Sequence, residues 1–314
     1  MTGATGFVGS NVLVRLGRMS HLCSLGAYRV DQTFAFQPCV VVGDINSSTD
    51  WRLAVRGQNV VIHSAARVHM MSDDSSDPLV EFRQVNVEGT LNLARQAAAA
   101  GVRRFIFISS IKVNGEGTPV GAPYLADAQP APVDPYGISK MEAEQGLRAL
   151  AVETAMEVVI IRPTLVYGPG VKANFLSMMR WLNKGVPLPF GAIHNRRSLV
   201  ALDNLVDLIV TCIDHPAAAN QTFLVSDGED LSTTELLRKM GLALGKPARL
   251  LPVPSRMLEV GAAVLGKKAL SQRLCGSLQV DISKTRELLN WTPPVCVDEA
   301  LRKTAKHFLE QQAK

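Results

Sequence analysis

The first half of the chain alternates short, strongly apolar runs with longer segments in which apolar residues recur every three or four positions. The runs are rich in β-branched residues, which is typical of strands buried on both faces of a parallel sheet. They predict strands at residues 25–30, 39–43, 60–63, 105–109 and 158–161. The periodic segments predict helices at 78–100 and at 135 to about 153. This alternation predicts an α/β fold, a doubly wound parallel (Rossmann) sheet with right-handed crossovers.

The pattern changes after Gly170, where helical segments alternate with loops rich in proline and glycine. We expect a dinucleotide-binding domain over residues 1–170 and a smaller, mostly helical substrate lobe over 171–314. In an alternative division, residues 197 to 214 return to the first domain. The predicted helices of this half lie at 175–184, 204–214, 233–244 and 298–311.

Three glycines near the start of the chain, Gly3, Gly6 and Gly9, form a GxxGxxG sequence that opens a predicted helix at residues 10–16. Glycines at this spacing permit a tight turn and let backbone N–H groups approach a pyrophosphate at the positive end of the helix. Such a loop normally follows a strand of the sheet, and only two residues precede Gly3. We therefore expect the first strand to be truncated, and upstream residues to raise the thermal stability.

The coenzyme preference depends on the residue that ends the second strand, and Arg29 lies there. An acidic side chain at this place binds the ribose 2′-hydroxyl of NAD, whereas an arginine accommodates the 2′-phosphate of NADP. Arg29 slightly favours NADP, and Asp31 keeps NAD open. Asp44 follows the strand at 39–43 and is placed to accept a hydrogen bond from the adenine amino group.

Three residues form a candidate catalytic group. Tyr136 and Lys140 lie one turn apart on the same face of a predicted helix, and Ser110 follows the strand at 105–109. A phenol has a reference pKa of about 10, so it is a poor base at neutral pH. A lysine ammonium and an oxidised nicotinamide ring nearby would stabilise the phenolate. Ser110 can hydrogen-bond the same substrate oxygen.

In this order the motifs resemble the extended short-chain dehydrogenase/reductase family, in the group of UDP-sugar 4-epimerases, 4-ketoreductases and nucleotide-sugar dehydratases. The resemblance covers nearly the whole chain, at residues 2–10, 43–45, 63–66, 86–90, 109–110, 136–140, 162–163, 197–203 and 290–291. It implies further cofactor contacts at Phe7, Val8, Ile45, Ala65, Ala66, Asn86 and Pro163. The substrate ligands that we expect are Lys112, Asn174, Arg197 and Arg273. Cationic side chains suit a diphosphate.

Departures from the family pattern reduce the number of reactions that the protein is expected to catalyse. Ile111 and Lys112 stand where the dehydratases have an Asp–Glu pair, so dehydration is excluded. Arg29 and Asn114 replace an acidic residue and a tyrosine that are usual in the epimerases. We therefore expect an NAD(P)-dependent reductase of a UDP-4-keto-6-deoxy-N-acetylhexosamine, resembling enzymes of bacterial O-antigen synthesis. The alternatives are a UDP-glucose or UDP-GlcNAc 4-epimerase, a reductase of a lipid or flavonoid ketone, and a non-catalytic nucleotide sensor.

The composition agrees with a globular enzyme, since the 314 residues are 47% hydrophobic and 19% charged. The net charge of +5 suits an anionic ligand, but the basic residues are scattered and only 5% of residues are aromatic, which argues against nucleic acid. The five cysteines lack a CxxC spacing, so we expect a cytoplasmic protein without a metal site. No apolar run is long enough to span a bilayer. The family resemblance implies a homodimer, which the apolar faces of the helices at 78–100 and 135–153 would allow.

Overall fold

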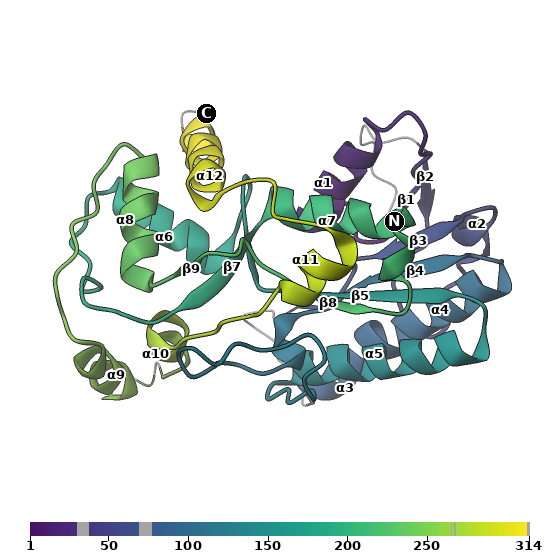
Figure 1. The fold of residues 1–314 in the computed structure, drawn as a ribbon, viewed down its shortest axis with the longest axis horizontal. Helices are drawn as coiled ribbons and strands as arrows, with labels where there is room; N and C mark the ends of the chain where they lie inside the picture. The colour runs from purple at the N-terminus through teal and green to yellow at the C-terminus, as the bar shows by residue number, and fades with distance from the viewer. Residues whose placement is uncertain (30–37, 69–76, 265, 267, 313–314) are drawn as a thin grey trace.

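The computed structural model describes residues 1–29, 38–68, 77–264, 266 and 268–312 (Figure 1). Its largest sheet is parallel, with strands in the order β3-β4-β5-β8. These strands span Val60–His63, Arg104–Ile108, Glu157–Pro163 and Thr222–Val225 respectively. A second parallel pair consists of β1 (Gly26–Tyr28) and β2 (Cys39–Val41). The doubly wound α/β fold predicted from the sequence is therefore confirmed.

Met1 and Thr2 join the two parallel sheets. The Thr2 N–H donates to the Ile62 carbonyl at 3.0 Å, and the Ala27 N–H donates to the Met1 carbonyl at 2.8 Å. Thr2 also forms a parallel bridge with His63. The first two residues thus occupy the position between β1 and β3, and Gly3 follows directly at the carboxyl edge of the sheet.

Both faces of the large sheet are covered, because side chains alternate along each strand. On one face, Ile106, Val159 and Ile161 pack with α1 (Phe7–Leu16) and α7 (Leu202–Asp214). On the other face the sheet packs with α4 (Thr90–Ala99) and α5 (Pro135–Glu153), through Phe105, Phe107, Val158, Ile160, Leu93, Ala94, Ala143 and Leu147. Figure 1 shows these helix layers above and below the strands. Burial on both sides explains why the strands are continuous apolar runs.

The helix α5 spans Pro135–Glu153, as predicted. The segment predicted as one helix at 78–100 has three parts, namely α3 (Pro78–Arg83), a π-helical turn (Gln84–Gly89) and α4 (Thr90–Ala99). The first helix begins at Phe7 rather than at residue 10, so the glycine loop leads into it without a gap. A short helix α2 (Arg52–Val55) and a 3₁₀ turn (Ile111–Val113) follow β2 and β4 respectively.

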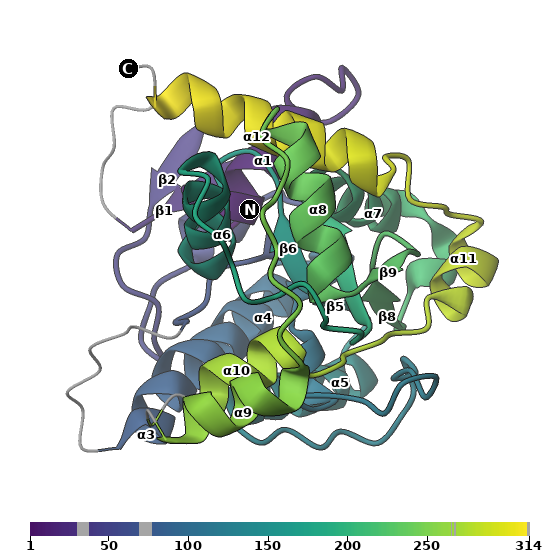
Figure 2. The same ribbon diagram turned by 90° about the vertical axis from the view of Figure 1, so that its left-hand side faces the viewer.

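The second half of the chain forms another apolar core. It is built from α6 (Ala173–Asn183), α8 (Thr233–Ala243) and α12 (Val297–Gln312) around β7 (Arg197–Ala201). Figure 2 faces this lobe and shows α12 across its top, with α9 (Ser255–Val264) and α10 (Lys268–Cys275) side by side at the bottom.

Short strands that were not predicted complete this region. β7 pairs in parallel with β6 (Leu165–Tyr167) and antiparallel with β9 (Asp230–Leu231). Such strands are too short to show an alternating pattern in the sequence. A 3₁₀ turn (Pro216–Ala218) precedes β8, and α11 (Ser283–Leu289) follows α10. The division at residue 170 stays a prediction, since α7 and β8 pack on or within the first sheet. Among the described residues, no helix is long and apolar enough to cross a membrane.

Candidate active site

The glycine loop has the geometry of a phosphate-binding turn. Gly3 has φ +65°, in the left-handed region that favours glycine. A side chain at Gly9 would collide with the Gly3 carbonyl oxygen, so the loop can close only with glycine there. Gly6 precedes α1 in extended conformation, and none of the described side chains caps this helix. Its first N–H groups therefore remain available for an anion, and Phe7 and Val8 form its first turn.

The predicted adenosine contacts lie around this loop. Arg29, just after β1, forms an ion pair with Asp44, and their side chains are 77% and 69% exposed. Asp31 lies outside the described residues. The chain at Ala65 and Ala66 passes beside the loop, because a Cβ atom at Gly3 would lie 2.8 Å from the Ala65 nitrogen. Ile45 packs on Gly89, because a Cβ atom added to Gly89 would lie 2.6 Å from the Ile45 Cγ2 atom.

The predicted catalytic residues meet where β4 ends and α5 begins. Ser110 follows β4, and its hydroxyl acts on the phenol of Tyr136, which lies in the first turn of α5. Burial and, to a smaller extent, the negative charge of Asp134 raise the pKa of Tyr136 to about 12, while the Ser110 hydroxyl partly opposes the shift. The phenol is therefore protonated in the protein alone. Tyr136 also meets Phe82 of α3 edge to face.

Lys140 lies one turn further along α5 and is only 2% exposed. Its Nζ atom stands 4.0 Å from the centre of the Phe107 ring. Burial lowers its pKa to about 7, although Glu144 partly opposes the shift. His63 stacks on Phe107 and is hydrogen-bonded to two threonine side chains, and burial lowers its pKa to about 3. A neutral histidine thus adds no positive charge beside the lysine.

Asn86 connects the loop after β3 to α5. Its Oδ1 atom accepts from the Arg67 N–H at 2.8 Å, and its Nδ2 donates to the Arg67 carbonyl at 3.1 Å. The same Nδ2 donates to the Ser139 hydroxyl at 3.0 Å. Ser139 immediately precedes Lys140, so Asn86 fixes the helix at its catalytic turn. Sequence reasoning identified Asn86 but not Ser139.

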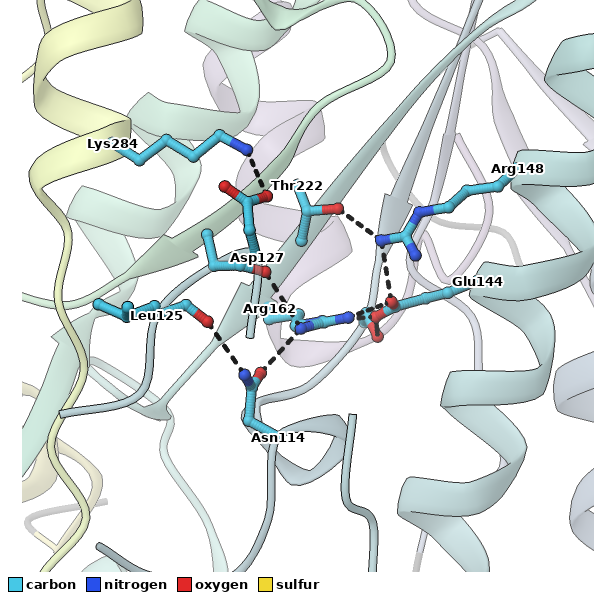
Figure 3. Close-up of polar contacts among 10 residues, drawn as sticks. Asn114, Leu125, Asp127, Glu144, Arg148, Arg162, Thr222 and Lys284 are labelled. Carbon is cyan, nitrogen blue, oxygen red and sulfur yellow. Dashed lines mark hydrogen bonds and ion pairs between the residues drawn. The ribbon is translucent and has the colours of Figure 1, made fainter. Parts of the chain in front are cut away.

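A buried polar cluster behind the trio was missed by the sequence analysis (Figure 3). Glu144, one turn after Lys140, accepts from Arg162 at 2.9 and 2.5 Å and from the Ser109 hydroxyl at 2.6 Å. Arg162 also donates to Asn114 Oδ1 at 2.9 Å, and Asn114 donates to the Leu125 carbonyl at 3.2 Å. The only signal in the sequence was a charged residue, Arg162, at the end of an apolar strand. The cluster links β4, β5 and α5.

The predicted substrate ligands come mainly from the second lobe. Arg197 begins β7 and donates to the Gly276 carbonyl at 3.0 Å. Burial lowers its pKa, and the nearby Arg273 lowers it too, while Glu116 raises it. Arg273 is exposed on α10 and Asn174 is exposed at the start of α6, whereas Pro163, predicted as a cofactor contact, is buried at the end of β5. Two neighbouring cations that repel each other suit a bound diphosphate.

Lys112 occupies a different environment from that expected of a substrate ligand. Its Nζ atom forms ion pairs with Glu116, at 3.0 Å, and with Asp134. Its assignment as a substrate ligand stays a prediction. Among the described residues, no three histidine, cysteine or acidic side chains are grouped so that they could bind a metal ion.

Comparison with known proteins agrees with this architecture. Residues 1–226 match the model of the NAD dependent epimerase/dehydratase family. A UDP-glucose 4-epimerase of Vibrio cholerae is 54% identical over 99% of this chain and 95% of its own length. An N-acetyl-alpha-D-glucosaminyl-diphospho-ditrans,octacis-undecaprenol 4-epimerase of Escherichia coli O157:H7 is 27% identical over 98% of this chain and 94% of that protein.

The fold also matches solved structures. A UDP-glucuronic acid 4-epimerase from Bacillus cereus, in complex with NAD, superposes with a TM-score of 0.77 at 20% identity, covering 100% of this chain and 98% of that one. At this identity the likeness concerns the fold alone. Together with the family match over most of the chain, it places the protein among enzymes that share one nucleotide-binding scaffold. The chain belongs to the NAD-dependent epimerase/dehydratase family and is an enzyme of the extended short-chain dehydrogenase/reductase group.

Proposed function

We propose that the protein is an NAD-dependent 4-epimerase that interconverts UDP-glucose and UDP-galactose. The observation that carries the proposal is the 54% identity, over almost the whole chain, to a protein named UDP-glucose 4-epimerase. This replaces the 4-ketoreductase that the sequence favoured. The trio of Ser110, Tyr136 and Lys140 serves either reaction. The choice between epimerisation and reduction therefore depends on the 54% identical protein and on the residues that differ from the epimerase pattern.

Arg29 and Asn114, the two residues that differ from the epimerase pattern, each interact with other residues of the protein. These interactions weaken the argument for reduction. The charge of Arg29 is engaged by Asp44, so its presence alone gives no preference for a 2′-phosphate. Asn114 joins Arg162 to the Leu125 carbonyl and thereby holds two segments of the buried cluster together. Its replacement of a tyrosine is therefore accounted for without a change of reaction. NAD is accordingly the coenzyme that we propose.

The side chains of this site are suited to move a proton at O4 of the sugar. Tyr136 exchanges that proton, and the Ser110 hydroxyl, which lowers the pKa of the phenol, holds the same oxygen. Because burial keeps the phenol protonated, its ionisation requires positive charge close by. Lys140 supplies one such charge from the next turn of α5. When bound, NAD provides the acceptor for the hydride from C4 and a second positive charge.

We assign the cofactor to the lobe that carries the glycine loop and the UDP-sugar mainly to residues of the second lobe. The glycine loop and the N-terminus of α1 hold the cofactor diphosphate, with Asp44, Ile45, Ala65, Ala66 and Pro163 along its length. Arg197 and Arg273 hold the diphosphate of the UDP-sugar, and Asn174 contacts it from α6. Charge-assisted hydrogen bonds to an anion are about twice as strong as neutral ones, so these two arginines provide most of the affinity for UDP.

The test is to incubate purified protein with UDP-glucose and to follow the sugar protons by NMR. We expect UDP-galactose to form without added reductant, and Tyr136→Phe to abolish its formation while UDP still binds. The same assay with UDP-GlcNAc defines the substrate range. If neither hexose is converted, and the protein instead consumes NADPH with a UDP-4-keto sugar, the proposal is wrong and the enzyme is a reductase.

We further propose that the enzyme is a cytoplasmic homodimer. None of the five cysteines, all of which lie among the described residues, forms a disulfide, which agrees with a reducing compartment. Val80 of α3 and Val152 of α5 are 56% and 88% exposed on the outer helix layer. Light scattering after size exclusion tests the dimer, since a monomeric mass would refute it.

A further inference from the structure

The turn that carries Ser110 packs directly on the start of the helix that carries Tyr136. The Lys112 carbonyl oxygen lies so close to Gly137 that a Cβ atom there would be 2.8 Å away. Ser110 accepts from the Lys112 N–H at 3.2 Å and so closes the turn. The turn at residues 110–112 therefore packs against the first turn of α5, which carries Tyr136.

A second set of contacts joins the same two segments through Asp134. One carboxylate oxygen of Asp134 caps α5 by accepting from the Gly137 N–H at 2.6 Å, and the other pairs with the Lys112 ammonium. The Lys112 side chain is 26% exposed and that of Asp134 is 18% exposed, so the pair is largely screened from water. Glu116 binds the same ammonium at 3.0 Å.

We propose that Lys112 is a positioning residue, which clamps the Ser110 turn to the cap of α5 through Asp134 and offsets the charge of that carboxylate beside Tyr136. This proposal rests on the proposed function in one respect, namely that Tyr136 exchanges a proton with O4 of the sugar. It also gives Lys112 a role other than that of a diphosphate ligand. Because Ser110 and Tyr136 must meet the same oxygen, a small shift between their segments slows the reaction without weakening UDP binding.

The charges around the phenol make this role measurable. Asp134 is the charged group that raises the pKa of Tyr136, besides burial. The elements packed around it also carry charged groups, namely Lys140, Glu142, Glu144, Arg148 and Glu153 on α5, Lys112 and Glu116 on and after the turn, and Glu81 and Arg83 on α3. Those on α3 are engaged in ion pairs with Arg67 and Glu142. Loss of the Lys112 cation therefore removes an ion-pair partner of Asp134, the carboxylate whose charge raises the pKa of the phenol.

The test combines Lys112→Met, Asp134→Asn and the double variant in the full chain. We expect Lys112→Met to lower kcat by about tenfold, equivalent to about 1.4 kcal/mol, with KM and the Kd for UDP within about twofold of wild type. The acid limb of the kcat profile should move to higher pH in Lys112→Met and to lower pH in Asp134→Asn, since asparagine still caps the helix. The double variant should behave as Asp134→Asn alone. Lys112→Arg should restore wild-type behaviour, and Glu116→Gln should leave the profile unchanged.

Two outcomes would contradict the positioning role of Lys112. A raised Kd for UDP with unchanged kcat would make Lys112 a substrate ligand. Additive effects in the double variant would show that Lys112 does not act through Asp134. Calorimetric titration with UDP does not depend on the reaction, so it decides between ligand and clamp even if wild-type protein fails to interconvert the hexoses.

Discussion

Glu144 of α5 and Arg162 of β5 form an ion pair in which both side chains are only 1% exposed (Figure 3). The pair joins the helix of Tyr136 and Lys140 to β5, and Ser109 joins it to β4. The helix α5 and the strands β4 and β5 are therefore connected through one buried carboxylate. Such a pair gives little net stability, but removal of one partner leaves the other charge buried.

We predict that Glu144→Gln destabilises the protein by about 3 kcal/mol, because the Arg162 guanidinium loses its counter-ion in the interior. Urea unfolding measures the change in the free energy of unfolding. Glu142→Gln on the same helix is the control, since the Glu142–Arg83 pair is more exposed and should contribute less than about 1 kcal/mol. Equal losses of unfolding free energy in the two variants would contradict the prediction that the buried pair matters more than the exposed one.

Lys140→Met should abolish activity and yet stabilise the nucleotide-stripped protein at acidic and neutral pH. Burial lowers the pKa of Lys140 from 10.5 to about 7, so folding is opposed most strongly below pH 7, where the lysine must be buried as a cation. In wild type this penalty is released as the pH rises from about 7 to 10.5, because the folded chain then holds the lysine neutral. The stability difference between variant and wild type should therefore shrink across this range in chemical denaturation. A difference independent of pH would be inconsistent with a buried, easily deprotonated lysine.

Gly9→Ala should prevent cofactor binding, because its Cβ atom would collide with the Gly3 carbonyl oxygen inside the phosphate-binding turn. Gly17→Ala is a matched control at the other end of α1. There φ is −63° and the added Cβ atom would lie 3.4 Å from the nearest oxygen, so NAD binding should be unchanged. Both are measured by titration with NAD. Normal affinity in Gly9→Ala would exclude the loop as the diphosphate site.

Arg197→Met should weaken UDP binding by about tenfold or more, since a charge-assisted hydrogen bond contributes about 1.5–3 kcal/mol. Arg196→Met removes the same charge from the adjacent, exposed position and should change the Kd by less than about threefold. Calorimetry gives both values at one ionic strength. If both variants lose affinity equally, the effect is one of overall charge and not of a specific site.

The sequence predicted elements best where burial imposes a pattern. β3 was located residue for residue and α5 from its first proline, since a strand buried on both faces and a capped helix are strong local signals. The strands β7 and β9 were missed, because their pairing depends on distant segments. Tyr136 and Lys140 share one helix turn and could be found together. The partners of Lys112, Glu144 and Arg162 could not, since opposite charges meet there only after folding.

The most direct test of the central claim follows the hydrogen at C4 of the sugar. UDP-glucose carrying deuterium at C4 is incubated with the purified enzyme in ordinary water, and the product is analysed by mass spectrometry and NMR. Epimerisation through return of the same hydride predicts UDP-galactose that keeps its deuterium at C4, and no product with Tyr136→Phe. Failure to form UDP-galactose, or UDP-galactose that has exchanged its deuterium for solvent hydrogen, would contradict the account.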